Sequence, residues 1–272
     1  MFNTIGIITK QQDITSEETA RKLGAFLKEQ GVSLVEDEKA IKKSADLIIV
    51  VGGDGSILST ARTYVDSNIP ILGINLGRLG FLADVSVESM TTLISVILSG
   101  EYIKEERSLL SCQVVRENTI LFQHLAFNEV AVHRNETPRM IEFELSVDGD
   151  FVNKQRADGM IVTTPTGSTA YALSSGGPIM HPSVNTICLV SISPHTMSHR
   201  PFILHGESEV LISLIDSDDK ATVSFDGQAS FSILLGDSLR VRQHDNFIHL
   251  IHPKDYDYFD IIRSKLHWGH KV

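Results

Sequence analysis

A glycine-rich turn with one acidic residue is the segment best suited to chemistry in this 272-residue chain. Gly52-Gly53-Asp54-Gly55 follows a run of apolar residues that predicts a buried strand, and a segment of helical spacing comes next. Glycines at a strand-to-helix turn let the backbone approach a ligand closely and direct free N–H groups at it. The turn is therefore a candidate phosphate site, with Gly52, Gly53 and Gly55 on the phosphate side.

Asp54 is unusual in such a setting, because a carboxylate repels bound phosphates. Three interpretations are open: Asp54 contacts the metal ion that accompanies the phosphates, it takes the proton of an attacking hydroxyl, or it caps the following helix. The segment has neither the Lys-Ser or Lys-Thr of a Walker loop nor the G-x-G-x-x-G spacing of a dinucleotide fingerprint.

A second glycine-rich turn, from Gly73 to Phe81, follows the next predicted strand. In an open parallel sheet both turns lie at the carboxyl edge, where ligands bind at a switch point. Asn75 offers an amide at this strand end, on the phosphate side of the candidate site, and a turn-forming role is the alternative.

The second half of the chain holds two further unusual segments. Asn128 and Glu129 interrupt the apolar run LAFNEVAV, and burial of such a pair without a partner or ligand is costly. Residues 163–178 carry no charge but many hydroxyl groups, several glycines and one tyrosine. This composition suits a neutral polar ligand such as a ribose with its base, and the alternative is a Ser/Thr-rich turn leading into a helix at 169–174.

The elements that must position these residues change in kind near residue 100. Before it, strand and helix patterns alternate, which predicts an α/β domain at 1–100 with an open, mostly parallel sheet. From 101 to 252, short strands with Asp-Gly turns at 148–149 and 226–227, and a further hairpin near 244–246, predict an antiparallel β-sandwich. Residues 253–272 are expected to pack back on the first domain. The predicted strands of the first domain are 4–9, 32–35, 46–51 and 69–74, and its helices are 16–30, 57–64 and 87–98.

Composition excludes several classes of protein. The chain is 42% hydrophobic and 21% charged, as in ordinary globular proteins. Its 24 Lys and Arg against 34 Asp and Glu give a net charge of −10, which opposes general binding to nucleic acid or an anionic membrane. Two distant cysteines, Cys112 and Cys188, form neither a disulfide framework nor a zinc motif, and no apolar run is long enough to span a membrane. We therefore expect a protein of the reducing cytoplasm.

Taken together and in order, the motifs resemble those of the NAD kinases, in particular those of Gram-negative bacteria, over essentially the full length. GGDG alone is shared with diacylglycerol kinases, sphingosine kinases and phosphofructokinases, whereas GGDG with TPTGSTAY is specific to the family. The motifs are GGDG at 52–55, GINLGRLGFL at 73–82, NE at 128–129, RADG at 156–159, TPTGSTAYALSSGGPI at 164–179, PHTMSHRP at 194–201, DGQ at 226–228 and LIHPKDYDYF at 250–259.

The resemblance implies an enzyme that transfers a phosphoryl group from ATP to the 2′-hydroxyl of the adenosine ribose of NAD. It implies a divalent metal ion, usually Mg²⁺ and held mainly by the substrate phosphates, and a homodimer or homotetramer. The implied fold is an α/β domain followed by a β-sandwich domain, with the site between them. Asp54 would be the general base, and Gly55 would line the site.

The resemblance also implies the residues that contact NAD. Asn128 and Glu129 would hydrogen-bond the nucleotide, while Arg156 and Asp158 would reach it from a facing strand or a neighbouring subunit. Arg139 stands where family members have His, Lys or Arg, and would contact phosphate. The ribose and adenine pocket would be formed by Thr169, Ala170, Tyr171 and Ser174 and closed by Gln228.

Two other functions remain open from the residues. A lipid or sugar kinase would share GGDG, but it predicts an apolar channel in the second domain and gives no reason for the NE and TGSTAY motifs. A non-catalytic regulator would bind NAD without turnover. One assay separates all three functions: the protein is incubated with ATP, Mg²⁺ and either NAD, diacylglycerol or fructose 6-phosphate, and ADP and NADP are measured.

Overall fold

The computed structural model describes residues 2–10, 12–77, 80–135, 139–217 and 220–268, and it divides into two compact units. The first unit is Met1–Glu106 with Ile248–Val272, and the second is Arg107–Phe247. The boundaries expected at residues 100 and 252 differ from these. The reason is that the strands β6 (Tyr102–Arg107) and β19 (Ile248–Pro253) both belong to the sheet of the first unit.

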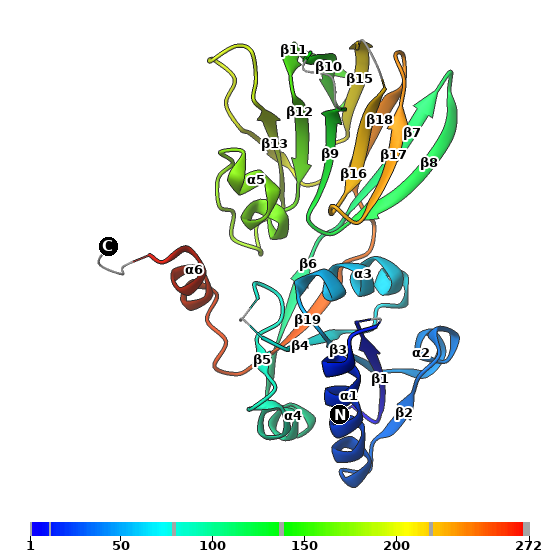
Figure 1. The fold of residues 1–272 in the computed structure, drawn as a ribbon, viewed down its shortest axis with the longest axis vertical. Coiled ribbons are helices and arrows are strands. Elements are labelled where there is room, and N and C mark those ends of the chain that lie inside the picture. Colours follow the sequence, from blue (N-terminus) through cyan, green and yellow to red (C-terminus); the bar gives the residue numbers. More distant parts are fainter. Residues whose placement is uncertain (1, 11, 78–79, 136–138, 218–219, 269–272) are drawn as a thin grey trace. The chain divides into compact units, whose positions relative to one another are not determined.

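The first unit is built on an open sheet with the strand order β2-β1-β3-β4-β19-β6, and β5 pairs with β4 (Figure 1). The pairs β1–β2, β1–β3, β3–β4, β4–β5 and β4–β19 are parallel, which confirms the predicted α/β class. The remaining strands are β1 (Thr4–Thr9), β2 (Ser33–Val35), β3 (Leu47–Val51), β4 (Ile71–Asn75) and β5 (Val85–Ser86), and the helices are α1 (Ile14–Glu29), α2 (Glu38–Ser44), α3 (Asp54–Tyr64), the 3₁₀ helix η1 (Val65–Ser67), α4 (Met90–Leu98) and α6 (Tyr258–Leu266).

Helices cover both faces of this sheet, and this explains why β3 is apolar throughout. Leu47, Ile49 and Val51 share one core cluster with residues of α1 and α4. The alternate residues Ile48 and Val50 are equally buried on the opposite face, because successive side chains of a strand point to opposite sides. Helix α2, which periodicity did not predict, contributes one buried side chain and is capped by an aspartate.

The strand order brings the two glycine-rich turns to one edge of the sheet. Because β1, β3 and β4 are parallel neighbours, the turns that follow them lie at the same carboxyl edge, and β1 is the point where the order reverses. The Ser16 hydroxyl of α1 donates to the Val51 carbonyl at 2.7 Å and accepts from the Lys10 N–H at 3.1 Å. These bonds tie the turn after β1 to the end of β3, directly before the GGDG motif.

The second unit is a β-sandwich of two antiparallel sheets, as predicted. The sheets have the orders β11-β10-β15-β18-β7-β8 and β14-β13-β12-β9-β16-β17, and residues of both contribute to one apolar cluster. The strands are β7 (Leu110–Arg116), β8 (Thr119–Ala126), β9 (Glu129–Arg134), β10 (Ile141–Val147), β11 (Asp150–Ala157), β12 (Gly159–Thr163), β13 (Thr186–Ile192), β14 (Phe202–His205), β15 (Val210–Asp216), β16 (Ala221–Phe225), β17 (Ala229–Ile233) and β18 (Ser238–Gln243); η2 (Thr166–Thr169) and α5 (Tyr171–Ser174) follow β12.

Two of the three predicted hairpins are present. Asp148-Gly149 joins β10 to β11 and Asp226-Gly227 joins β16 to β17, and all four residues have the positive φ that these turns require. The hairpin expected near residues 244–246 is wrong, because β18 pairs within the sandwich whereas β19 belongs to the sheet of the first unit. This segment instead carries the chain from the second unit back to the first.

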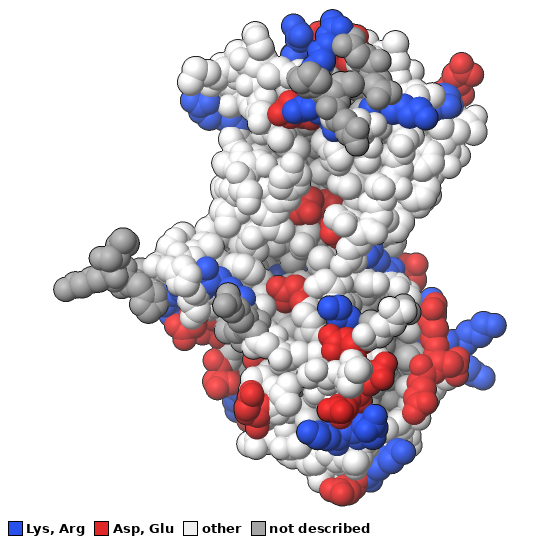
Figure 2. Space-filling model, in the orientation of Figure 1, with Lys and Arg blue, Asp and Glu red and all other residues white. Residues whose placement is uncertain are grey.

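The charged side chains, the helices and the cysteines of the described residues agree with what the composition indicated. Figure 2 shows acidic and basic side chains mixed over the elements of the first unit, while much of the second unit is uncharged on this face. In the described part of the chain, no helix is long and apolar enough to cross a membrane. Cys112 and Cys188 are free and buried, and burial raises the pKa of their thiols to about 12 and about 11.

The β10–β11 hairpin offers a matched test of the sandwich core. Phe143 on β10 is fully buried in the core cluster, whereas Phe151 on β11 is 64% exposed. We expect Phe143→Ala to lower the free energy of unfolding by about 3–5 kcal/mol, because it removes a buried ring and leaves a cavity. Phe151→Ala should change it by less than about 1 kcal/mol. Urea denaturation of both variants measures the difference, and equal effects would contradict this assignment of the core.

Candidate functional site

Asp54 is the first residue of α3, and its carboxylate binds the backbone of the second glycine-rich turn. Its Oδ2 accepts the N–H of Phe81 at 2.9 Å, while Oδ1 accepts those of Leu82 at 3.1 Å and Ala83 at 3.3 Å. Gly53 is the residue at the helix N-cap, so the interpretation of Asp54 as the cap is wrong. The carboxylate instead fixes the course of residues 81–83.

Gly80 makes this arrangement possible. A Cβ atom on Gly80 would overlap the Asp54 carboxylate, so the turn admits no side chain there. Gly80 N–H donates to the Ala83 carbonyl at 3.2 Å and closes the turn, while residues 78–79 of the motif lie outside the described part. A carboxylate has about four acceptor positions, so the three backbone bonds leave Asp54 able to accept one more hydrogen.

Asn75 and the glycines of GGDG have different surroundings. Asn75 is 6% exposed; its Oδ1 accepts the Gly77 N–H at 2.9 Å and its Nδ2 donates to the Ala83 carbonyl at 3.4 Å. Its side chain therefore supports the turn, which was the alternative to a ligand contact. Gly52 is buried, whereas Gly53 and Gly55 are exposed and accessible to a ligand.

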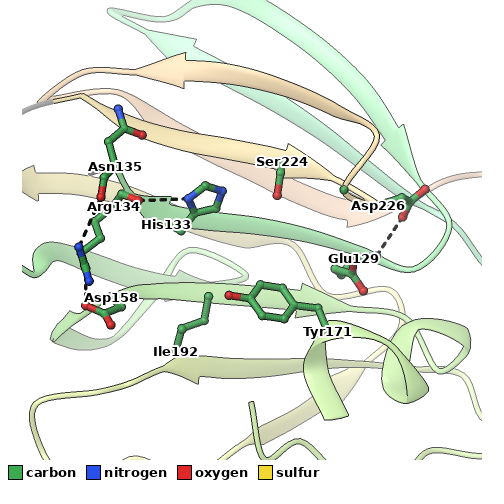
Figure 3. Close-up of a pocket in the computed structure, with 10 residues that line it drawn as sticks. Glu129, His133, Arg134, Asn135, Asp158, Tyr171, Ile192, Ser224 and Asp226 are labelled. Carbon is green, nitrogen blue, oxygen red and sulfur yellow. Dashed lines mark hydrogen bonds and ion pairs between the residues drawn. The ribbon is translucent and has the colours of Figure 1, made fainter. Parts of the chain in front are cut away.

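A cavity of about 510 Å³ lies on the second unit (Figure 3). It brings together three residues that were predicted to bind NAD: Glu129 at the start of β9, Asp158 between β11 and β12, and Tyr171 at the start of α5. The complete lining is Glu129, His133, Arg134, Asn135, Asp158, Tyr171, Ile192, Ser224, Asp226 and Gly227.

Glu129 is the most perturbed titratable group of this cavity. Burial, together with the nearby charge of Asp226, raises the pKa of Glu129 to about 7, although a hydrogen bond from the Tyr171 backbone counteracts the shift. The residue is 6% exposed, and its Oε2 is buried with no hydrogen-bond partner among the described residues. The raised pKa and the unpartnered oxygen together mark Glu129 as a functional-site candidate.

Asp226 determines where Asn128 and Glu129 lie. Its Oδ1 accepts the N–H groups of Asn128 at 2.7 Å and Glu129 at 3.1 Å, and its Oδ2 accepts that of Phe127 at 2.9 Å. Figure 3 shows Asp226 and Glu129 joined in this way at one end of the cavity. Sequence reasoning missed this role, because Asp226-Gly227 was interpreted as a hairpin turn and as part of the DGQ motif, and no contact was assigned to Asp226.

The hydroxyl-rich run after β12 packs directly on the NE motif. The Asn128 carbonyl accepts the N–H of Thr164 at 2.9 Å and the hydroxyls of Thr163 and Thr164 at 3.1 and 3.2 Å. Gly167 touches the same carbonyl, so a Cβ atom has no room there. This close packing holds η2 and α5 beside the first residues of β9.

Several hydroxyls of this run are occupied inside the protein. Ser168 is fully buried; its hydroxyl donates to the Pro165 carbonyl at 2.6 Å and accepts the Met180 N–H at 3.0 Å. Tyr171 is 42% exposed and its ring lies in the cavity (Figure 3). The structural alternative therefore accounts for Thr163, Thr164 and Ser168, while Tyr171 remains the ligand candidate of this segment.

Asp158, which lines the cavity, forms an ion pair with Arg134 at 2.6 Å between Oδ1 and Nε.

The other residues of the second unit that were predicted to bind NAD do not line the cavity. Arg156 is exposed on β11, in the other sheet of the sandwich. The residues outside the lining are Asn128, Arg139, Arg156, Thr169, Ala170, Ser174 and Gln228; of these Asn128, Thr169 and Ala170 are half-buried and the others are exposed.

His133 was missed although the sequence held a signal for it. Glu129, Ala131 and His133 alternate along β9 on the face opposite to the core residues Val130 and Val132. A polar residue two or four positions from Glu129 therefore shares its face. No comparable signal marks Arg134, Asn135 or Ser224, which reach the cavity from the strand end and from β16.

The pKa of Glu129 gives a pH dependence of stability. Because the pKa is raised from 4.5 to about 7, the folded protein holds this proton where the unfolded chain has lost it. The stability that this group contributes is fully present below pH 4.5 and is lost as the pH rises to about 7, by an amount on the order of 3 kcal/mol. Glu129→Gln, which stays neutral, should therefore gain stability relative to wild type across this window.

Urea denaturation at several pH values tests this expectation. Glu144→Gln, at an exposed position on β10, is the matched control and should differ from wild type by a constant amount. A difference between Glu129→Gln and wild type that does not change with pH would contradict the raised pKa.

Comparison with known proteins agrees with the motifs. Residues 36–102 match the family described as the ATP-NAD kinase N-terminal domain, and residues 127–252 match the ATP-NAD kinase C-terminal domain. An NAD kinase of Hydrogenovibrio crunogenus is 45% identical over 291 residues, with 100% of both chains covered. An NAD kinase of Thiobacillus denitrificans is 42% identical, with 100% of this chain and 99% of the relative covered.

Solved structures share the fold. The yeast NADH kinase complexed with NADH superposes with a TM-score of 0.91 at 23% identity, covering 99% of this chain and 89% of that chain. An NAD kinase from Archaeoglobus fulgidus in complex with ATP superposes with a TM-score of 0.78 at 27% identity, covering 97% and 98%. With relatives this similar over its full length, the chain belongs to the NAD kinase family.

Proposed function

We propose that this protein transfers the γ-phosphoryl group of ATP to the 2′-hydroxyl of the adenosine ribose of NAD, giving NADP and ADP. The observation that carries the proposal is the cavity of the second unit, in a chain of this family. There a buried carboxyl group, one oxygen of which has no hydrogen-bond partner among the described residues, lies near an exposed aromatic ring. A nucleoside offers hydroxyls to the carboxyl group and a flat base to the ring.

Within this proposal, the second unit binds the acceptor. Glu129, which lines the cavity, hydrogen-bonds a ribose hydroxyl, and its pKa of about 7 allows it to act as donor or acceptor at neutral pH. Tyr171 supports the base by stacking, and Asp158 accepts a further hydroxyl while Arg134 holds it in place. Asn128 contributes through the turn that Asp226 fixes.

Asp54 is the proposed general base. A ribose hydroxyl is a weak nucleophile at neutral pH, and a carboxylate can accept its proton while the new P–O bond forms and the bond to ADP breaks. The N–H groups of Phe81, Leu82 and Ala83 prevent rotation of this carboxylate, so it is oriented before substrate binds. The exposed Gly53 and Gly55 are the positions at which phosphates can approach the backbone.

A divalent ion, Mg²⁺, is the proposed cofactor. In the described residues no group of three or more His, Cys, Asp or Glu side chains is arranged as a metal cage. This fits Mg²⁺, which is commonly held by one or two carboxylates together with substrate phosphates and water. When bound, the ion would neutralise charge on the transferring phosphates.

The residues outside the cavity need a different explanation. Arg156, Arg139 and Gln228 are exposed, and the proposal assigns them contacts with substrate in a homodimer or homotetramer. A cytoplasmic location agrees with the two free, buried cysteines. Sedimentation velocity determines the size of the assembly, and a monomer at all concentrations would remove the oligomer from the proposal.

Asp54→Asn tests the general base. We expect turnover to fall by about 10²–10⁴-fold because the acceptor of the proton is lost, while NAD still binds. Asp66→Asn, at an exposed position in the same unit, is the control and should keep its activity. The assay measures ADP and NADP with ATP, Mg²⁺ and NAD, and isothermal titration measures NAD binding. Activity retained in Asp54→Asn would remove Asp54 from the role of base.

The same assay separates the alternative functions. Wild-type protein is incubated with diacylglycerol or fructose 6-phosphate in place of NAD. ADP formed with either of these, and no NADP formed from NAD, would identify a lipid or sugar kinase. NAD binding without any NADP would identify a regulator.

A further inference from the structure

The first unit contains a buried histidine between two carboxylates. His252 on β19 is 1% exposed; its Nδ1 lies 2.8 Å from Oδ2 of Asp84, and its Nε2 lies 3.1 Å from Oε2 of Glu105. Its ring also stacks on Tyr256, with centroids 3.9 Å apart. The imidazole of His252 therefore joins three segments of the first unit: the turn that ends at Asp84, strand β6 and strand β19.

Hydrogen bonding determines the charge of this group. A neutral imidazole donates from only one nitrogen, so its second nitrogen would turn a lone pair toward a carboxylate. The doubly protonated imidazolium donates to both carboxylates and satisfies the geometry. Burial acts to lower the pKa of His252, but the bonds and charges of Asp84 and Glu105 outweigh it and raise the pKa above its ordinary value.

The cluster connects to the proposed general base through four consecutive residues. Asp84 directly follows Ala83, and the N–H groups of residues 81–83 hold the Asp54 carboxylate. The turn is thus held at one end by Asp54 and at the other by the bond from His252 to Asp84. We propose that His252 is a positioning residue for the phosphoryl transfer, because as an imidazolium it fixes Asp84 and thereby the turn that orients Asp54.

Two neighbouring carboxylates form pairs of their own. Glu106 lies 3.4 Å from His249, and Glu101 lies 2.5 Å from Lys254. His249 is on the same strand as His252 but contacts neither Asp84 nor Glu105 among the bonds of the described residues. His249→Gln is therefore a matched control that removes a histidine–carboxylate pair without touching the turn.

The inference rests on the proposed function, because its effect is measured in turnover. His252→Gln should lower kcat by about tenfold or more and leave the KM for NAD within about threefold, since the acceptor is bound by other residues. His249→Gln should match wild type. Circular dichroism and thermal unfolding verify that each variant is folded. Equal kcat values for folded His252→Gln and His249→Gln would overturn the inference.

A second variant keeps the test valid if His252→Gln does not fold. If the imidazolium positions Asp54, kcat should fall as the pH rises through the pKa of His252, because the imidazolium then loses its proton. Asp84→Asn removes one of the carboxylates that raise this pKa, so the fall of kcat should occur at lower pH in this variant than in wild type. If Asp84 had a purely structural role, Asp84→Asn would lower stability without changing the pH at which kcat falls. An active, folded Asp84→Asn variant in which kcat falls at the wild-type pH would contradict the inference.

Amide hydrogen exchange gives a readout that does not depend on activity. Exchange of the Phe81, Leu82 and Ala83 amides should be faster in His252→Gln or Asp84→Asn than in His249→Gln. If wild-type protein forms no NADP, the proposed function fails, and faster exchange still supports the coupling of His252 to the turn. Unchanged exchange in both variants would refute that coupling.

Discussion

The candidate site depends on one kind of interaction, an aspartate carboxylate that accepts three consecutive backbone N–H groups. Asp54 does this for residues 81–83 in the first unit, and Asp226 does it for residues 127–129 in the second. Consecutive N–H groups that converge on one point cannot be satisfied by a regular helix or sheet, and leaving them unpaired is costly. A carboxylate has the charge and the acceptor positions to bind all three.

This interaction explains why the unusual residues of each unit occur together. The turn that Asp54 binds comes so close that Gly80 has no room for a side chain, and the turn that Asp226 binds is packed equally closely against Gly167. Each turn then holds a candidate functional group in a fixed position: the Asp54 carboxylate itself in one case, and Glu129 in the other. The His252–Asp84 bond extends the same arrangement outward from the first turn.

The sequence predicted the elements better than the side-chain contacts. Strand β3 and the Asp-Gly turns were found because apolar runs and positive φ are local properties of the chain. The hairpin near 244–246 was not, since only tertiary pairing shows that β18 and β19 belong to different sheets. Composition and resemblance pointed to Glu129 and Tyr171, and both line the cavity of the second unit. The bonds of Asp54 and Asp226 join residues 27 to 29 and 97 to 99 positions apart, and no local pattern predicts such pairs.

Hydrogen exchange in Asp226→Asn tests the role of these carboxylates most directly. The NH2 group of an asparagine side chain cannot accept a backbone N–H, so this residue keeps only one of the two acceptor oxygens that hold residues 127–129. A hydrogen bond to a charged group contributes about 1.5–3 kcal/mol, so exchange of these amides should accelerate by about tenfold or more. Amides 81–83, held by Asp54, should exchange at their wild-type rates. Unchanged protection at residues 127–129 would contradict the account.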